Sequence, residues 1–340
     1  MMIGKDDKIW VTGCTGLVGS YIVRALLRAG YIQLICNRRS TSKMSHVKDF
    51  SDQVDWTEID LTSSYDVFEQ VGKVDIVIHA AALVSFNPSD QDSLITMNVD
   101  VTRDLVNAGI EHGLKKFIFI SSVAALGKRK DGKTIDEQSE WKDSPLNSPY
   151  GISKKRGELE VWRGAQEGLE VVILNPSYIL GTGIWGQSSL RLYTDIMKGN
   201  RFYPMGTNGF VDVRDVAQAA VIAMDKNIVN DNYIISAENL SYQAVMEIMT
   251  KVMDIDPPQK PLTPRLRSMY YWYKKITSLL TFKRSSITRS TLESLSLTSH
   301  YSNQKSIDAL GMKYRNIPKT LKDTTEKFLA EDETPLPLNK

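Results

Sequence analysis

The chain has 340 residues, of which 42% are hydrophobic and 24% charged, as in an ordinary soluble globular protein of about two domains. Its 42 basic and 40 acidic residues are spread along the sequence, so composition does not support a nucleic-acid-binding surface. Two cysteines, Cys14 and Cys36, and no signal-like apolar start predict a reduced, cytoplasmic setting. The four histidines lack ligand spacing, so we expect no metal site.

A glycine-rich turn lies between an apolar run at 9–11 and a helical pattern that ends at Gly30. Gly13 allows a sharp bend, Gly16 allows close approach of a pyrophosphate, and Gly19 allows tight helix packing. The N–H groups at the start of the helix would face the anion. A tight strand–helix turn without a ligand is the alternative. The turn predicts a phosphate cradle formed by Gly13, Thr15, Gly16, Leu17 and Val18.

The next predicted strand, 31–36, leads into Arg38 and Arg39, where the adenosine ribose of a dinucleotide would lie. A carboxylate there would accept hydrogen bonds from a free 2′-hydroxyl, whereas a guanidinium complements a 2′-phosphate. The two arginines therefore favour NADP(H) and leave NAD(H) open. A solvated basic loop is the alternative.

Two further strand ends are candidates for contact with the cofactor. A strand at 54–60 ends in Asp60 and Leu61, which would meet the adenine, and Asp60 as a helix cap is the other interpretation. The run 74–82 is almost continuously apolar, as in a strand buried on both faces of a parallel sheet. Its small last residues would let a flat cofactor lie against the strand end, with close helix–sheet packing as the alternative. They are Ala80, Ala81 and Ala82.

A long helical pattern at 95–113 contains Asn98, and the buried strand at 116–122 ends in Ser121 and Ser122. Helices and strands thus alternate through five strands. This alternation predicts an α/β fold with a Rossmann-type, doubly wound parallel sheet, and ligands at the carboxyl ends of the strands.

Tyr150 and Lys154 are four residues apart on a predicted helix and therefore share a face. An ammonium beside a phenol stabilises the phenolate, so we expect a lowered Tyr150 pKa and an acid or base that works near neutral pH. The spacing alone is a weak signal, because any helix can carry it as a solvated pair. The glycine turn and the serine-ended strand strengthen the prediction.

Together these motifs resemble the extended short-chain dehydrogenase/reductase family, known broadly as the epimerase/dehydratase group. The resemblance covers nearly the whole chain. Val101 departs from it, because the family usually has glycine there. The matching motifs are Thr12-Gly-x-x-Gly-x-x-Gly19, His79-Ala-Ala-Ala82, Asn98-Val99, Ser121-Ser122, Tyr150-x-x-x-Lys154, Asn175-Pro176-Ser177 and the segment 209–217.

The resemblance implies a role for each catalytic residue. Ser122 would hydrogen-bond the substrate oxygen, and Tyr150 would exchange its proton. Lys154 would hold the ribose hydroxyls and tune Tyr150, while Asn98 would anchor its helix and a proton-relay water. The remaining contacts with the cofactor would come from Ser121, Tyr150, Lys154, Pro176 and Ser177.

The sequence Asn175-Pro176-Ser177 resembles the branch of dihydroflavonol reductases and 3β-hydroxysteroid dehydrogenases, whereas sugar-nucleotide enzymes more often have Arg-Pro. This implies an NADP(H)-dependent oxidoreductase that interconverts a carbonyl and an alcohol on a moderately apolar small molecule. A nucleotide-sugar epimerase or dehydratase is the alternative, because Arg191, Arg201 and Arg214 are available for a diphosphate. A cofactor-sensing regulator without catalysis is a minor alternative.

We expect residues 1–176 to form the dinucleotide-binding domain and 177–330 mainly a smaller, mixed substrate-binding region, with about 209–236 returning to the Rossmann core. The aromatic segment 266–282 is too short in apolar residues to span a membrane. A pocket lid or homodimer contact is favoured there over a membrane-surface helix. Residues 331–340 resemble a disordered tail.

Overall fold

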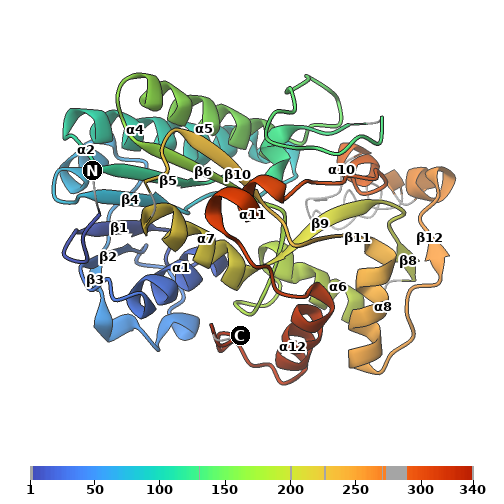
Figure 1. Cartoon of the computed structure of the whole chain (residues 1–340). Helices are drawn as coiled ribbons and strands as arrows, with labels where there is room; N and C mark the ends of the chain where they lie inside the picture. The colour runs from blue at the N-terminus through green and yellow to red at the C-terminus, as the bar shows by residue number, and fades with distance from the viewer. Residues whose placement is uncertain are drawn as a thin grey trace.

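A seven-stranded parallel sheet forms the centre of the computed structural model (Figure 1). Its strand order is β10-β6-β5-β4-β1-β2-β3, so the direction of winding reverses between β1 and β4. This reversal is the topological switch point of a doubly wound fold. The predicted Rossmann-type α/β fold is confirmed. The structure describes residues 3–129, 131–199, 201–225, 227–269, 271–272 and 289–338.

The strands of this sheet are short, and the central ones are buried along their whole length. Burial on both faces explains their continuous apolar runs. Because β1 pairs in parallel with β2 and β4, with Thr12 opposite His79, the carboxyl ends of the strands lie along one edge. The strands are β1 (Ile9–Thr12), β2 (Leu34–Asn37), β3 (Asp55–Thr57), β4 (Ile76–His79), β5 (Lys116–Ile120), β6 (Val171–Pro176) and β10 (Asp231–Ile235).

Helices cover both faces of the sheet (Figure 1). Ile9 and Val11 contribute to the apolar core beneath α1 and α7, whereas Trp10 contributes to the core on the opposite face. The alternation of side chains along a strand produces these two layers. The covering helices are α1 (Leu17–Arg28) and α7 (Val213–Asp225) on one face, and α2 (Ser64–Val71), α4 (Val101–Glu111) and α5 (Pro149–Gln166) on the other.

The helical pattern predicted at 95–113 is not one regular helix. Helix α3 (Gln91–Ile95) leads into a π-helical turn (Thr96–Asp100), and α4 follows. Asn98 lies in this turn and is 1% exposed. Such turns are rare and often occur at functional sites. The turn directs the Asn98 side chain into the protein.

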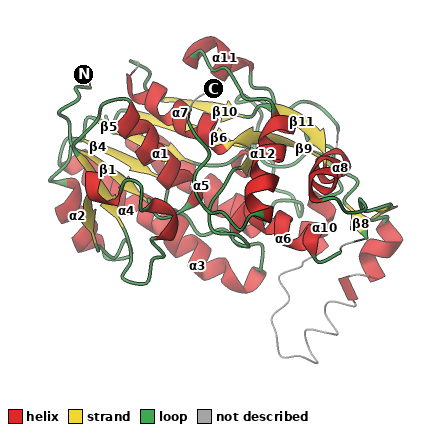
Figure 2. Ribbon diagram, turned by 90° about the horizontal axis from the view of Figure 1, so that it is seen from below, coloured by secondary structure: helices red, strands yellow, loops and turns green. Residues whose placement is uncertain are grey.

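A smaller mixed region lies at one end of the molecule (Figure 2). Its three-stranded sheet has the order β11-β9-β7, while α7 packs against α1 and β10 pairs with β6 in the large sheet. The chain therefore returns to the Rossmann core after β9. The remaining elements are β7 (Tyr178–Leu180), α6 (Arg191–Met197), β8 (Phe202–Tyr203), β9 (Thr207–Asp212), β11 (Glu238–Ser241), α8 (Tyr242–Met253), β12 (Lys260–Pro261), α10 (Arg289–Ser294), α11 (Gln304–Leu310) and α12 (Ile317–Leu329).

The C-terminal residues 331–338 are packed on the protein, which corrects the expectation of a disordered tail there. Leu336 is 4% exposed, and its amide donates to Tyr21 Oη at 2.7 Å. Arg214 donates to the carbonyl oxygen of Pro337 at 3.1 Å. A tail of polar composition is ordered here because its backbone groups and one leucine find partners on the folded surface.

The segment 266–282 lies largely outside the described residues, and so does its assignment as a lid, dimer contact or membrane-surface helix. In its described part, Met269 is 68% exposed and Trp272 51% exposed. Among all the helices that the structure describes, none is long and apolar enough to cross a bilayer.

Candidate active site

The glycine turn packs closely against the end of β4. Gly13 has φ +73°, and a Cβ there would lie 2.7 Å from the amide nitrogen of Ala81. A Cβ at Gly19 would lie 2.2 Å from the carbonyl oxygen of Gly13, so glycine lets α1 start directly behind the turn. Gly16 precedes α1 and provides no side-chain cap for its first N–H groups. These features fit a pyrophosphate at the start of α1.

A buried hydrogen bond joins β1 and β4 beneath this turn. Thr12 Oγ1 lies 2.7 Å from His79 Nδ1 and accepts a hydrogen bond from the Ala81 amide at 3.1 Å. Burial lowers the pKa of His79 to about 3, so the ring is neutral. The pair holds the partly exposed Ala80–Ala82 segment beside the glycine turn. Thr12 and His79 both belong to the matching motifs, but the sequence did not predict the hydrogen bond between them.

Arg38, at the end of β2, has an acidic partner that the sequence pattern did not reveal. Its guanidinium lies 2.7 Å from Glu58 Oε1 and 6.0 Å from the Trp56 ring centre. Parallel pairing of β2 and β3 brings Glu58 to this place from a separate part of the sequence. Arg39 is exposed. The expected ribose site therefore contains two arginines and one carboxylate.

Asp60 and Leu61 occupy different environments. Asp60 Oδ1 accepts hydrogen bonds from the amide and hydroxyl of Thr62 at 2.9 and 2.8 Å, and these bonds lower its pKa. The N-cap of α2 is Ser63, so Asp60 is not that cap. Leu61 is 8% exposed and packs in the core beneath α2 and α4. Of these two residues, which follow β3, only Asp60 is exposed to solvent.

Ser122 and Tyr150 are brought together by the start of α5. Ser148 caps this helix by accepting from the Gly151 amide at 3.0 Å. A Cβ at Gly151 would lie 2.8 Å from the Ala124 carbonyl oxygen, so glycine permits close approach of α5 to the turn after Ser122. As a result, the Tyr150 side chain lies near enough to Ser122 for the serine hydroxyl to lower the pKa of Tyr150, while Ser122 Oγ accepts from the Ala124 amide at 3.2 Å.

Lys154 lies one turn further along α5 and is 1% exposed. Its Nζ donates to the Ile120 carbonyl oxygen at 2.7 Å and lies 4.4 Å from the Phe119 ring centre. Burial lowers the pKa of Lys154 to about 7, against the opposing effect of the Glu158 carboxylate. An ammonium has three donors, so the amine can hold further acceptors.

The pKa of Tyr150 differs from the expectation. Burial raises it to about 12, and the hydrogen bond with Ser122 lowers it only in part. The prediction that Lys154 lowers the pKa of Tyr150 is wrong for the protein without cofactor, because the cost of desolvating the phenolate is the larger effect. The Lys154 ammonium is directed at the Ile120 carbonyl. Tyr150 is therefore protonated at neutral pH.

Asn98 joins three segments around Lys154. Its Nδ2 donates to the Leu83 carbonyl oxygen and to Ser153 Oγ, both at 2.9 Å. Its Oδ1 accepts from the Leu83 amide at 2.8 Å. Asn98 thus ties the π-helical turn to the loop after β4 and to α5, and its part in a water relay stays a prediction.

The Ser121 side chain is bound within the protein, and a contact of this residue with the cofactor stays a prediction. Ser121 is 4% exposed, and its Oγ donates to Glu158 Oε1 at 2.6 Å. Asn175 Nδ2 donates to the same oxygen at 2.5 Å. Glu158 was missed by sequence reasoning, although its position four residues after Lys154 on the same helix was a usable signal.

The end of β6 presents a buried hydroxyl with no hydrogen-bond partner. Pro176 is the last residue of β6, and Ser177 follows, with 6% of its surface exposed. The Ser177 amide donates to the Ile235 carbonyl oxygen at 3.0 Å, whereas its Oγ has no partner among the described residues. A buried hydroxyl without a partner is rare and fits a site that awaits a polar ligand group.

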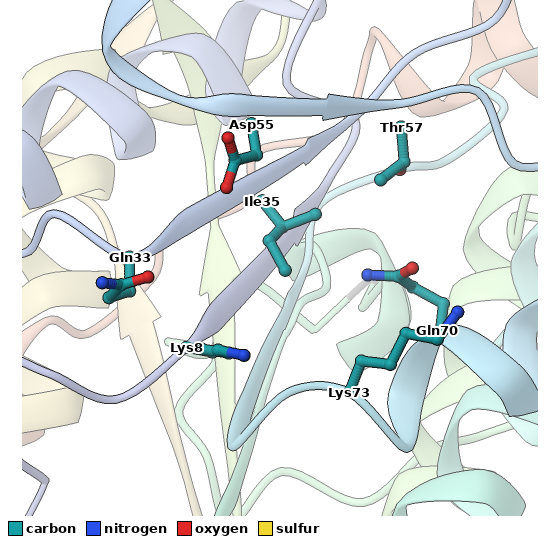
Figure 3. A pocket seen from close by; sticks show the side chains of 7 residues that line it. All are labelled: Lys8, Gln33, Ile35, Asp55, Thr57, Gln70 and Lys73. Atoms are coloured by element: carbon teal, nitrogen blue, oxygen red, sulfur yellow. The ribbon is translucent and has the colours of Figure 1, made fainter.

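A cavity of about 370 Å³ lies at the other end of the sheet (Figure 3). Lys8 and Gln33 precede β1 and β2, so the cavity opens toward the amino ends of these strands. Open α/β sheets bind ligands at the carboxyl ends, and this cavity is therefore not the active site. Within the described parts of the chain, no cluster of histidine, cysteine and carboxylate side chains could hold a metal ion. The cavity is lined by Lys8, Gln33, Ile35, Asp55, Thr57, Gln70 and Lys73.

Comparison with protein families gives a match to the NAD dependent epimerase/dehydratase family over residues 9–236. This match spans most of the chain and includes the glycine turn, Ser122, Tyr150 and Lys154. The chain belongs to this family. The protein is therefore an NAD(P)-dependent enzyme of the extended short-chain dehydrogenase/reductase type, as its motifs predicted.

Several relatives among curated proteins are named as reductases. The chain is 28% identical to the putative dihydroflavonol 4-reductase of Synechocystis sp. over 337 residues, which cover 96% of each chain. It is 31% identical to tetraketide alpha-pyrone reductase 2 of Arabidopsis thaliana over 258 residues, or 70% of this chain and 80% of the relative. The crystal structure of gox2253 has a TM-score of 0.81 and 27% identity, covering 97% of this chain and 100% of that one.

Proposed function

We propose that this enzyme is an NADP(H)-dependent oxidoreductase that interconverts a ketone or aldehyde and the corresponding alcohol on a moderately apolar small molecule. The observation that carries the proposal is the close approach of the start of α5 to the turn after β5, which brings Tyr150 beside Ser122, with Lys154 one helical turn away. The names of the related reductases support the same reaction type.

The chemistry follows from the two hydroxyls. The bound cofactor supplies the hydride for the carbonyl carbon. Ser122 and Tyr150 bind the carbonyl oxygen, and Tyr150 donates its proton to that oxygen as negative charge develops. The raised pKa of Tyr150 keeps the phenol protonated before the reaction, as a proton donor must be. Lys154, one helical turn further along α5, would donate to the ribose hydroxyls of the cofactor. This arrangement favours the reducing direction.

The surroundings of Tyr150 support an apolar substrate. Val84 and Phe86 are 42% and 43% exposed on the loop that follows Ala82. The Phe86 ring meets the Tyr150 ring edge-on, with ring centres 6.0 Å apart. Exposed apolar side chains beside a reactive hydroxyl are typical of a site for an apolar ligand.

The arginines that a sugar nucleotide would require are not gathered at the site. Arg214 is 6% exposed, and its Nε donates to Asp212 at 2.8 Å, so it anchors the start of α7. The side chain of Arg191 is 58% exposed and pairs with Asp195 at 3.6 Å on the surface of α6. An epimerase or dehydratase reaction on a nucleotide sugar therefore has less support than a net reduction.

Cofactor preference rests on the end of β2. Arg38 and Arg39 supply positive charge for a 2′-phosphate. Glu58 neutralises part of this charge through its contact with Arg38, so NADP(H) is preferred and NAD(H) is also used.

The test is Tyr150→Phe. Loss of the donated proton should lower kcat by about 10²–10⁴-fold, the usual contribution of a positioned acid. The affinity for NADPH should change little, because only one hydroxyl is lost. The measurements are NADPH oxidation with a panel of apolar ketones and aldehydes, and NADPH titration by fluorescence.

Tyr65→Phe is the matched control, because Tyr65 lies on α2 and is 71% exposed. It should keep full turnover. If Tyr150→Phe also kept full turnover, the proposed mechanism would be wrong. Conversion of a nucleotide sugar by the unaltered enzyme without net consumption of NADPH would support the epimerase alternative instead.

A further inference from the structure

Glu158 is a carboxylate buried in the core of the active-site region. It lies on α5 with 2% of its surface exposed. Within the described chain, its cationic neighbour at ion-pair distance is Lys155, and their charged atoms are 3.9 Å apart. Burial of a carboxylate with so distant a counter-charge costs free energy. Burial raises the pKa of Glu158, and the hydrogen bonds that it accepts from the Ser121 hydroxyl and the Asn175 amide oppose this effect by favouring the charged form.

The first connection runs to Ser122. The Asn175 Nδ2 that donates to Glu158 also donates to the Ser122 carbonyl oxygen at 3.1 Å. Ser121, the preceding residue, donates directly to Glu158. The carboxylate therefore fixes the chain at 121–122 through two hydrogen bonds, from β5 and from β6. This is the segment that must hold the Ser122 hydroxyl against Tyr150.

The second connection runs to Lys154. Glu158 follows Lys154 by one helical turn, and both side chains are buried. No carboxylate of the described residues lies within ion-pair distance of Lys154, whose amine is bound to the Ile120 carbonyl. The Glu158 charge raises the pKa of Lys154 against the effect of burial.

We propose that Glu158 is a positioning residue for the reaction: its buried carboxylate holds Ser122 in place through Asn175 and provides the negative charge one helical turn from the Lys154 amine. The proposal rests on the function proposed above. Glu158 does not touch the substrate in this role. It acts through Ser122, which it holds in place, and through Lys154, whose charge it favours.

The test compares Glu158→Gln with Glu160→Gln. Glutamine has nearly the shape of glutamate and can still accept from Ser121 and Asn175, so the substitution removes mainly the charge. Glu160 lies on the same helix, pairs with Arg163 at 2.9 Å and provides the same charge change away from the site.

The first readout is the pKa of Lys154 in the protein without added cofactor. It is followed by the carbon-13 shift of the lysine ε-carbon, assigned with Lys154→Arg. Glu158→Gln should lower this pKa by about one unit, the lower end of the effect of a nearby opposite charge. Glu160→Gln should leave it unchanged. An unchanged pKa in Glu158→Gln would overturn the charge role, whether or not the proposed reaction is correct.

The second readout is the pH profile of kcat/KM for NADPH-dependent reduction. The alkaline limb should move to lower pH in Glu158→Gln, because Lys154 loses its proton earlier. A variant that merely folds less well would lose activity at every pH without moving the limb, and this result would also overturn the proposal. Absence of any reduction by the unaltered enzyme would refute the proposed function and leave the first readout valid.

A second variant covers the case in which Glu158→Gln does not fold. Ser121→Ala removes one donor that favours the charged carboxylate, so it should lower the Lys154 pKa in the same direction by a smaller amount. A rise or no change in that pKa would contradict the proposal.

Discussion

Burial, more than neighbouring charge, determines the protonation of Tyr150 and Lys154, the residues proposed to act in catalysis. It raises the pKa of Tyr150 to about 12 and lowers that of Lys154 to about 7. Spacing on a helix predicted that the two residues share a face, but it gave the wrong direction for the Tyr150 pKa. The cost of desolvating an ionised group depends on every atom around it, and the sequence pattern does not contain this information.

The buried ammonium of Lys154 should reduce stability. Its pKa is lowered from 10.5 to about 7, so between these values the unfolded chain binds more protons than the folded chain. The free energy of unfolding should therefore rise with pH across that window. Lys154→Met should abolish activity and stabilise the fold by about 1–3 kcal/mol near neutral pH, with a gain that shrinks as pH approaches about 10.

Urea unfolding at several pH values measures this effect. Arg156→Met is the matched control, because Arg156 lies on the same helix and is exposed. Its stability should follow that of the unaltered protein at each pH. A Lys154→Met variant that is less stable than the parent throughout the window would show that packing of the lysine stem outweighs the buried charge.

At the scale of elements, sequence periodicity predicted the strands and helices of the Rossmann half well. The central strands are continuously apolar because helices cover both faces, and this pattern is local and readable. The π-helical turn at Asn98 was not predicted, since it depends on where the side chain must anchor Leu83 and Ser153. The folded conformation of the C-terminal residues was also not predicted, because the groups that they contact lie on helices distant in the sequence.

Removal of residues 331–340 tests this last point. The truncated chain loses the bonds from Leu336 to Tyr21 and from Arg214 to Pro337, together with a buried leucine. Its free energy of unfolding should fall by about 2–4 kcal/mol, measured by denaturant titration. Removal of 339–340 alone is the control and should have little effect. An unchanged midpoint for the longer truncation would show that the tail is not bound in solution.

At the scale of the whole molecule, the parallel sheet gathers groups from separate parts of the chain at one edge. The glycine turn, Arg38, Ala80–Ala82, Ser122 and Ser177 all follow the carboxyl ends of strands. The smaller mixed sheet begins at β7, directly after Ser177. The topological switch between β1 and β4 makes this edge the ligand-binding side.

Binding of cofactor at this edge should stabilise the entire fold. At a concentration about 100 times the dissociation constant, the gain is about 2.7 kcal/mol. At equal concentrations NADPH should raise the Tm more than NADH does. Arg38→Asp should reverse this order, because the carboxylate repels a 2′-phosphate and accepts from a free 2′-hydroxyl.

Two controls make the cofactor comparison specific. Glu58→Gln should increase the preference for NADPH, because it removes the carboxylate that pairs with Arg38. Arg28→Asp places the same charge change at the far end of α1 and should leave the order of the two cofactors unaltered. If the Arg38→Asp variant still preferred NADPH, the proposed role of Arg38 in the choice between the two cofactors would be wrong.

By itself, the sequence determined the alternation of strands and helices, the glycine turn and the Tyr150–Lys154 spacing, because each depends on residues close together in the chain. These features were enough for the fold and the family. Tertiary structure alone decided that Glu58 meets Arg38, that Glu158 accepts hydrogen bonds from Ser121 and Asn175, and that burial raises the pKa of Tyr150. The reason is physical: ion pairing across strands and desolvation depend on neighbours that only folding brings together.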